Sequence, residues 1–192
     1  MSDDQNLKKT GKKQNLSTLM ATGQGFSGFV WPENCGDFDI RIAEDGTWYY
    51  RNSPIGRKKL VQLFATVLQR DEMGQYWLVT PVERGLVQVD DAPFVIVEMR
   101  VKLGDCGREL HMRTNLDHWI RLDGDHELSV RKAPHSHEDR PYVHIRDGLE
   151  ALVNRTVYYS LVDIAELRKN TLVIESAGYS FTLGSLEEDY EH

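Results

Sequence analysis

Positively charged side chains gather where the sequence predicts the start of a helix. Three cations, Arg57 to Lys59, follow Ser53-Pro54, a pair that suits the N-cap and first position of a helix. The free amides and the dipole at a helix start attract anions, and a guanidinium can hold a phosphate or carboxylate through two hydrogen bonds. Arg57 is therefore a candidate anion ligand, although acidic side chains elsewhere are an alternative source of the countercharge.

Two further segments place polar groups at the ends of predicted strands. Thr80 and Glu83 flank Pro81, which lacks a backbone donor and therefore favours a strand end. Arg113 and Asn115 follow an apolar strand and offer donors that suit a phosphate or the edge of a base. We count all four polar residues as candidate ligands, and a turn that only connects strands is the competing interpretation.

Aromatic side chains recur on the predicted strands, and most of them must lie in the core. Trp48 and Tyr142 are the candidates for stacking on a nucleobase, because an aromatic face beside an arginine suits a planar, charged ligand. Arg146, close to Tyr142 in the chain, completes the candidate ligand set. The chain has no nucleophile elbow, Walker loop or dinucleotide fingerprint, so no catalytic residue is assigned.

A His-x-His pair, His135 and His137, is the natural place to look for a metal. It lies in a loop of proline, serine and charged residues, without a second group of ligands at a recognisable spacing. A hydrolase or metal enzyme would need these histidines to converge with a carboxylate. We therefore expect no metal, no other cofactor and no enzymatic activity.

Composition narrows the classes of partner. The 192-residue chain has a formal net charge of −7, which disfavours a nucleic-acid duplex, whereas a small anion needs only a local cationic cluster. Cys35 and Cys106 are the only cysteines and form no disulfide framework. The sequence shows neither a signal-peptide pattern nor a membrane-spanning stretch, so we expect a cytoplasmic protein without a membrane partner. Its oligomeric state is not indicated.

The order of predicted elements occurs twice along the chain. The first copy is a strand, a helix and two strands, at 47–50, 57–70, 76–79 and 86–89. The second copy is a strand, a helix capped by Asp147, and two strands, at 142–145, from 149, and at 172–174 and 179–181. A true duplication would give two related halves with an interface between them, where small ligands tend to bind. Two similar pieces built from common turn chemistry are the alternative.

These elements predict an α+β protein in which antiparallel sheets are each backed by one main helix. We divide the chain into a flexible basic tail, two α+β domains and an acidic tail, at 1–25, 26–92, 93–186 and 187–192.

Several motifs together resemble a bacterial family, domain-of-unknown-function family 1285. They cover nearly the whole chain after the first tail, at Cys35–Ile40, Asp45–Trp48, Ser53–Arg57, Leu60–Phe64, Tyr76–Glu83, Val89–Phe94, Arg113–Asn115 and Pro141–Ala151. The runs Leu78–Glu83 and Asp91–Phe94 are the most specific. The turn Arg146-Asp147-Gly148 departs slightly from the family's two-glycine turn.

The resemblance implies a duplicated core, a C-terminal half similar to pleckstrin-homology-like folds, and a nucleotide-like ligand at the domain interface. Our leading interpretation is a non-enzymatic signalling module in which a partner protein reads the relative orientation of the halves. Arg57 and Arg113 would pair with phosphate, and Thr80 and Asn115 would bond the base or sugar. The alternative is a protein-interaction module without a small ligand.

Overall fold

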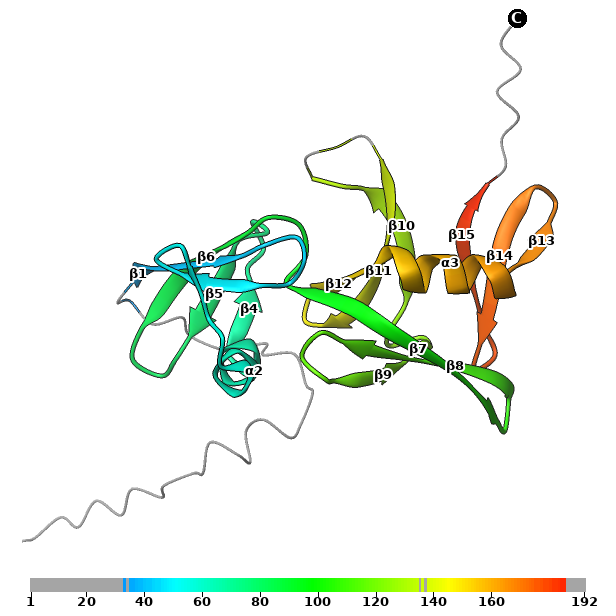
Figure 1. The fold of residues 1–192 in the computed structure, drawn as a ribbon, viewed down its shortest axis with the longest axis horizontal. Helices are drawn as coiled ribbons and strands as arrows, with labels where there is room; N and C mark the ends of the chain where they lie inside the picture. Colours follow the sequence, from blue (N-terminus) through cyan, green and yellow to red (C-terminus); the bar gives the residue numbers. More distant parts are fainter. Residues whose placement is uncertain (1–32, 34, 135, 137, 186–192) are drawn as a thin grey trace, which may run out of the picture.

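The fold is described from a computed structural model, and the description covers residues 33, 35–134, 136 and 138–185. The tails predicted at 1–25 and 187–192 and the pair His135 and His137 lie outside these residues. The described chain forms two six-stranded sheets, one three-stranded sheet and two helices (Figure 1).

Sheet A is built from the first half of the described chain. In spatial order its strands are β3 (Ser53–Pro54), β2 (Trp48–Tyr50), β1 (Cys35–Ile42), β6 (Arg84–Val89), β5 (Tyr76–Val79) and β4 (Leu68–Arg70). Neighbouring strands are antiparallel except for the central pair, β1 and β6, which is parallel. The predicted Asp45-Gly46 hairpin is confirmed, with Ile42 paired to Trp48. Gly46 has a φ of 81°, which glycine adopts without strain.

Helix α2 (Lys58–Thr66) packs on sheet A through the apolar face that its sequence predicts. Val61 and Ala65 are buried, and the ring of Phe64 stacks on Trp48 with 6.3 Å between centroids. The predicted helix was too long at its C-terminal end, because residues 68–70 form the edge strand β4.

The predicted start of this helix was also wrong. Ser53 and Pro54 form the short edge strand β3, where the missing amide of proline costs no hydrogen bond within the sheet. Arg57 occupies the N-cap position instead, and its side chain makes no capping hydrogen bond.

Sheet B repeats the topology of sheet A. In spatial order its strands are β10 (Leu128–Lys132), β11 (Asp139–Arg146), β12 (Leu149–Val153), β7 (Phe94–Gly104), β8 (Gly107–Thr114) and β9 (Trp119–Arg121). Each sheet consists of two three-stranded antiparallel groups joined by one parallel pair, which is β1 with β6 in sheet A and β7 with β12 in sheet B. The first and last strands of each set of six are therefore the ones that meet at the centre.

The structural repeat differs from the predicted one in its boundaries. The similar sheets span residues 35–89 and 94–153, whereas the sequence pattern matched 47–89 with 142–181. The sequence pattern aligned the two helices with each other, but they occupy different positions in the two halves of the chain. Helix α2 connects the third and fourth strands of sheet A, whereas the matching connection in sheet B is a short loop, and helix α3 (Arg155–Ile164) follows the sixth strand.

The segment from Leu149 to Val153 was predicted to begin a helix and is instead strand β12. Asp147 and Gly148 both have positive φ values, 46° and 72°, and they form the hairpin turn between β11 and β12. Helix α3 starts only at Arg155, where the Asn154 side chain accepts a hydrogen bond from the amide of Val157 at 2.8 Å.

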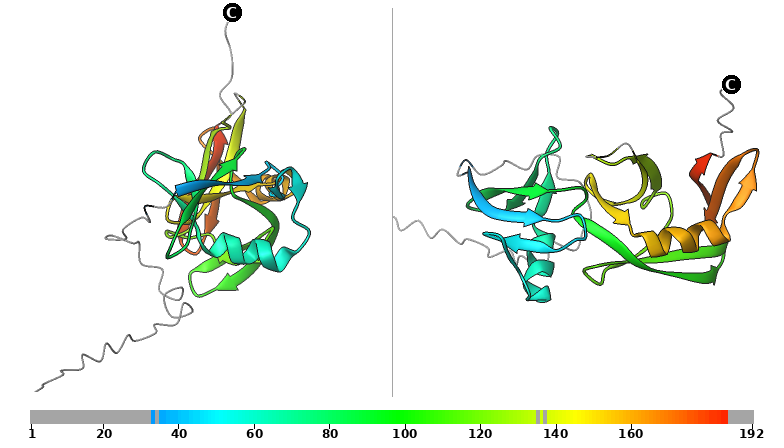
Figure 2. Two further views of the ribbon diagram at one scale, coloured as in Figure 1. Left: turned by 90° about the vertical axis from the view of Figure 1, so that its left-hand side faces the viewer. Right: turned by 45° about the horizontal axis from the view of Figure 1, so that its top comes forward.

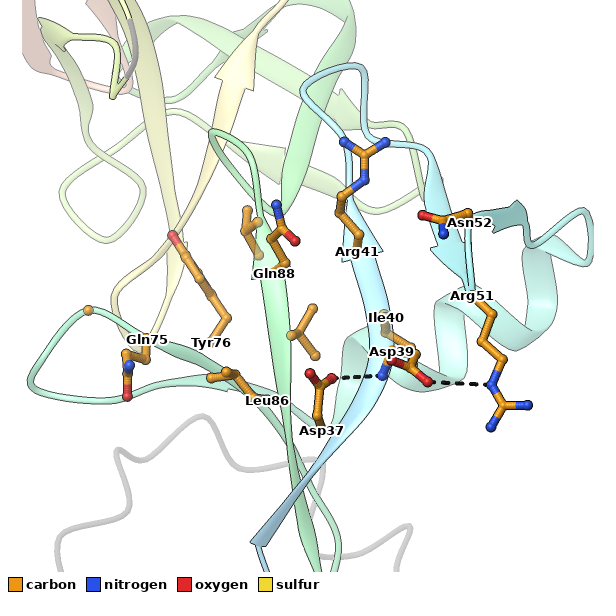
Figure 3. Close-up of a pocket in the computed structure, with 13 residues that line it drawn as sticks. Asp37, Asp39, Ile40, Arg41, Arg51, Asn52, Gln75, Tyr76, Leu86 and Gln88 are labelled. Atoms are coloured by element: carbon orange, nitrogen blue, oxygen red, sulfur yellow. Dashed lines mark hydrogen bonds and ion pairs between the residues drawn. The ribbon is translucent and has the colours of Figure 1, made fainter.

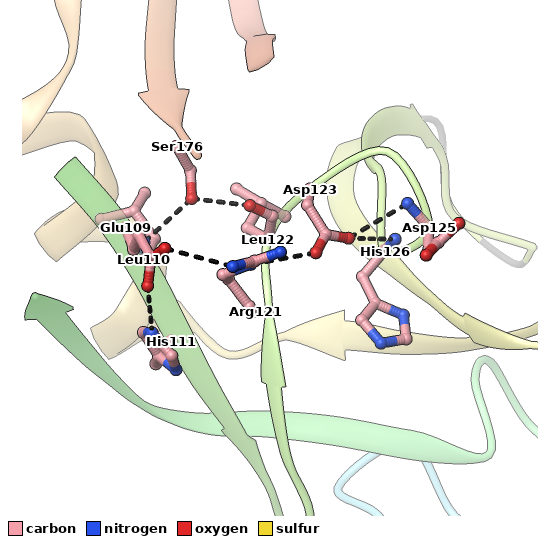
Figure 4. Close-up of polar contacts among 9 residues, drawn as sticks. All are labelled: Glu109, Leu110, His111, Arg121, Leu122, Asp123, Asp125, His126 and Ser176. Carbon is pink, nitrogen blue, oxygen red and sulfur yellow. Dashed lines mark hydrogen bonds and ion pairs between the residues drawn. The ribbon is translucent and has the colours of Figure 1, made fainter. Parts of the chain in front are cut away.

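Sheet C follows α3 and consists of β13 (Glu166–Arg168), β14 (Thr171–Ser176) and β15 (Tyr179–Ser185). Buried Ser176 attaches it to sheet B. Its hydroxyl accepts from the amide of Leu110 at 2.9 Å and donates to the carbonyl of Leu122 at 2.6 Å (Figure 4).

A single apolar core runs through both sheet units. It joins side chains of sheet A, such as Ile42 and Leu68, with side chains of sheet B, such as Ile96 and Val143. Figure 1 and the right view of Figure 2 show the sheets beside each other along the long axis, with α3 running beside β7. The protein therefore consists mainly of two similar sheets with few helices. This fold agrees only roughly with the predicted α+β class, because strands predominate.

We refer below to sheet A with α2 as the N-terminal unit, and to sheet B with α3 and sheet C as the C-terminal unit.

Candidate functional site

The candidates in the N-terminal unit do not converge on one site. Arg57 is exposed at the start of α2. Thr80 and Glu83 close the turn between β5 and β6, where the Thr80 hydroxyl donates to the Glu83 carbonyl at 2.9 Å and accepts from the Glu83 amide at 3.1 Å. The turn interpretation therefore accounts for the contacts of both residues.

Arg113 and Asn115 are already engaged by other parts of the protein. Arg113 forms ion pairs with Glu98 at 2.7 Å and with Asp117 at 2.9 Å, and these hydrogen bonds raise the pKa of its guanidinium. Asn115 connects the two units, since its side chain accepts from the Val95 amide and donates to the Gly46 carbonyl, both at 3.1 Å.

Trp48 and Tyr142 cannot stack on a base in this structure. Trp48 is 2% exposed and lies between sheet A and α2, while Tyr142 is fully buried at the interface between the units. The predicted stacking role is therefore corrected, because both rings are enclosed by protein.

Arg146 fastens the C-terminal unit to the end of α2. Its guanidinium donates to the carbonyl of Ala65, in the last turn of α2, at 2.7 Å, and to the carbonyl of Leu68, at the start of β4, at 3.4 Å. Burial lowers the pKa of Arg146. Together with Asn115, Arg146 therefore holds the units at two points, and neither side chain is free for a ligand.

A pair of arginines that the sequence patterns did not reveal meets at the interface. Arg70, at the end of β4, and Arg131, on β10, both approach the carboxylate of Glu150 on β12. The Glu150 Oε2 atom lies 2.8 Å from Arg131 Nη2 and 4.0 Å from Arg70 Nη1. Burial lowers the pKa of Arg131, but the hydrogen bond and charge of Glu150 raise it, and the net shift is upward. We call Arg70 and Arg131 the interface arginine pair.

Each arginine of this pair lies over a tyrosine ring. The guanidinium carbon of Arg70 is 5.4 Å from the ring centroid of Tyr76, and that of Arg131 is 3.7 Å from the centroid of Tyr142. These rings hold the guanidinium groups in place. The arginine side chains remain 35% and 37% exposed, so solvent and solutes reach the pair.

A chain of polar contacts, buried at Tyr142 and Asp91, continues from Tyr142 along the interface towards solvent. The Tyr142 hydroxyl donates to Asp91 Oδ1 at 2.8 Å, and Arg140 bonds Asp91 Oδ2 at 3.1 Å as well as Glu44. Burial and Asp91 raise the pKa of Tyr142 well above its ordinary value, so the phenol stays neutral. A small cavity of about 140 Å³ opens here between Glu44, Asp90 and Arg140.

A larger cleft of about 520 Å³ lies on sheet A (Figure 3). Charged and amide side chains line much of it, namely Asp37, Asp39, Arg41, Arg51, Asn52, Gln75 and Gln88. A bulge in β1 shapes one wall, where Asp39 has a φ of 52° and its amide donates to Asp37. The lining also includes Gly74 and Tyr76, which both lie against Arg70, whereas Arg70 and Arg131 themselves do not line the cleft.

The histidines that the structure describes do not form a metal centre. Within the described ranges, no group of three or more histidine, cysteine, aspartate or glutamate side chains is arranged to hold a metal ion. One polar cluster that contains a histidine is an ion-pair network, in which Glu109 contacts His111 at 3.0 Å and Arg121 at 3.1 Å, and Arg121 also contacts Asp123 (Figure 4). Its charges are paired with one another, which indicates a structural role. No helix of the described chain is long and apolar enough to cross a membrane.

The fold and this interface define a protein of two similar sheet units with polar contacts between them. A model of the N-terminal domain of the DUF1285 family matches residues 30–92, and a model of its C-terminal domain matches residues 93–183. The chain belongs to this family of proteins of unknown function, which confirms the resemblance predicted from its motifs.

Two solved structures are similar to this chain. A DUF1285 family protein from Silicibacter pomeroyi DSS-3 is 38% identical, with a TM-score of 0.74 over 82% of this chain and 86% of that chain. A DUF1285 family protein from Shewanella baltica OS155 is 27% identical, with a TM-score of 0.53 over 65% of this chain and 90% of that chain. No curated protein matches the chain.

Proposed function

We propose that the protein is a non-enzymatic regulatory module that binds a nucleotide-like anion at the interface of its two units. The observation that carries this proposal is the interface arginine pair, Arg70 and Arg131. One guanidinium comes from each unit, both are partly exposed, and both approach a single carboxylate. Arginine is well suited to phosphate because its planar fork donates two parallel hydrogen bonds.

The cleft on sheet A supports a ligand larger than phosphate alone. Its volume of about 520 Å³ lies within the range of small-molecule sites. Amide side chains such as Gln75 and Gln88 offer both donors and acceptors, which suits the edge of a base or the hydroxyls of a sugar. The ligand's anionic group would sit at Arg70 and Arg131, with the remainder in the cleft beyond Gly74.

A ligand held by one arginine from each unit would change how the units are arranged. Such a ligand shifts the population towards the arrangement in which both arginines reach it. The C-terminal unit has six strands followed by α3, an order that supports the predicted likeness to pleckstrin-homology-like folds. We propose that this unit presents the change to a signalling protein partner in the cytoplasm.

A thermal-shift screen of the purified protein tests this proposal. Nucleoside monophosphates, dinucleotides and cyclic nucleotides are compared with sulfate at equal concentration. Selective stabilisation by one nucleotide class is expected, and Arg131→Ala should abolish it. Arg155→Ala is the matched control, because Arg155 also lies over a tyrosine ring, that of Tyr159, but is exposed on α3. Equal shifts with sulfate and nucleotides would contradict a nucleotide site.

A protein-interaction module is the second candidate, and one observation favours it. The long β7–β8 hairpin exposes apolar side chains near its tip, with Leu103 91% and Val101 50% exposed. Exposed apolar groups of this kind commonly mark contact surfaces. A flat response to every small molecule in the screen, together with binding of a partner that Leu103→Asp removes, would favour this function.

A further inference from the structure

Glu150 occupies the position that the proposed function assigns to the anionic group of the ligand. Its carboxylate is 2.8 Å from Arg131 and 4.0 Å from Arg70. In the described part of the chain, it is the only carboxylate within ion-pair distance of either guanidinium. The unliganded site is therefore closed by an anion that the protein itself supplies.

The charges at this position are not balanced. Two guanidinium groups carry two positive charges, whereas the carboxylate of Glu150 supplies one negative charge. Only one of the two contacts is a close hydrogen bond, since the Arg70 contact lies at the limit of an ion pair. An anion with two negative charges and three terminal oxygens would satisfy both arginines better than Glu150 does.

Glu150 is also able to leave this position. Its side chain is 21% exposed and rotates about three bonds, so the carboxylate can turn towards water. Partly exposed ion pairs of this kind contribute little net stability. A singly charged ligand that displaces the Glu150 carboxylate gains little interaction energy with the arginine pair. A doubly charged ligand gains a further charge interaction with the pair.

We infer that Glu150 is a built-in competitor that sets which anions bind the interface arginine pair. It excludes singly charged carboxylates and phosphodiesters and yields to doubly charged phosphomonoesters. This inference rests on the proposed function and deepens it, because it names a terminal phosphate monoester as the chemical class of the ligand's anionic group.

Calorimetric titrations of the wild type and of Glu150→Gln test the inference. The probes are orthophosphate, adenosine 5′-monophosphate and adenosine 3′,5′-cyclic monophosphate. The glutamine keeps an acceptor for Arg131 but removes the charge. In the wild type the monoester should bind about tenfold or more tightly than the cyclic diester. In Glu150→Gln all three probes should gain about tenfold in affinity, because displacing the carboxylate costs each of them the same free energy, and the preference for the monoester over the diester should remain.

Glu98→Gln is the matched control. Glu98 also lies between two arginines, Arg100 and Arg113, but all three residues are on β7 and β8 of the C-terminal unit. This variant should bind all three probes as the wild type does. Glu150→Asp is a second test variant, whose shorter side chain keeps the charge but reaches the arginines less well, and it should shift affinity in the same direction by a smaller factor.

The outcomes separate the inference from the proposed function. Unchanged or weaker binding by Glu150→Gln would overturn the inference, since Glu150 would then be neutral or an acceptor for the ligand. If orthophosphate binds Glu150→Gln more tightly but no nucleotide binds any variant, the competitor role stands and the nucleotide proposal fails. If none of the probes binds any variant, both are overturned.

Discussion

At the scale of single residues, one close contact explains why β6 (Arg84–Val89) carries a glycine near its start. The ring of Phe38, in the bulge of β1, packs directly on Gly85, and a β-carbon at this position would overlap that ring. Glycine therefore permits the bulge that shapes the wall of the cleft on sheet A.

Gly85→Ala should destabilise the protein by about 1–3 kcal/mol, because the added methyl forces Phe38 or β1 to move. Gly36→Ala is the matched control. Gly36 is the partner of Gly85 in the parallel pair and has no atom near its missing β-carbon. Urea unfolding measures both variants, and equal midpoints would contradict the packing described here.

Tyr142 is a second residue whose contacts predict a measurable effect. Tyr142→Phe removes the hydroxyl that donates to Asp91 and leaves the buried carboxylate with Arg140. The expected loss is about 1–3 kcal/mol in the free energy of unfolding at neutral pH. Tyr159→Phe on the surface of α3 is the control and should change stability little.

The pH dependence of Tyr142 has a definite sign. Burial and Asp91 raise its pKa above the unfolded value of about 10, so above that pH the folded state holds a proton that the unfolded state releases. The stabilisation from this group is complete below about pH 10 and is lost as the pH rises further. The stability gap between wild type and Tyr142→Phe should therefore narrow above about pH 10, and a widening gap would contradict the assignment.

At the scale of elements, local signals predicted strands and turns well and helix boundaries poorly. Asp45-Gly46 formed its hairpin because the turn closes through local contacts: Gly46 adopts a positive φ, and its amide donates to the Ala43 carbonyl. Asp147-Gly148 carries the same signal together with a capping-box glutamate, Glu150. The residues after this turn form strand β12 and not a helix because they pair with β7, a strand that is distant in the sequence.

The candidate site was predictable only in part for the same reason. Tyr142 and Arg146 do lie at the interface, but the sequence could not show that their polar groups are already used. Arg70, Arg131 and Glu150 come from three separate strands, and only the packing of sheet B against β4 brings them together. No local spacing contains that information.

The two helices predict contrasting effects of N-cap substitutions. Asn154→Ala removes the hydrogen bond that caps α3 and should cost about 1 kcal/mol of stability. Arg57→Ala at the N-cap position of α2 removes no capping bond and should change stability by less than about 0.5 kcal/mol. Thermal unfolding compares the two variants, and a larger loss for Arg57→Ala would refute this account of the helix starts.

At the scale of the whole molecule, the two units share one core and are fastened by polar contacts from the C-terminal unit. Arg146 caps α2, and Asn115 holds the β1–β2 turn. These contacts join the two sheets, because side chains of the C-terminal unit supply partners for backbone carbonyls of the N-terminal unit.

Arg146→Ala should cost about 1–3 kcal/mol and reduce the cooperativity of unfolding, since the carbonyls of Ala65 in α2 and Leu68 in β4 lose their partner. Arg168→Ala is the control, because Arg168 pairs with Glu166 and Glu175 on exposed strands of sheet C. Differential scanning calorimetry should show a calorimetric enthalpy above the van't Hoff enthalpy only for Arg146→Ala. A single two-state transition in both variants would show that the core alone couples the units.

The most direct test of the interface site is a crystal structure of the protein soaked with adenosine 5′-monophosphate. Density for the phosphate is expected between Arg70 and Arg131, with the Glu150 side chain turned towards solvent and the nucleoside in the cleft on sheet A. Phosphate bound elsewhere, or an interface in which Glu150 keeps both arginines at saturating nucleotide, would contradict it.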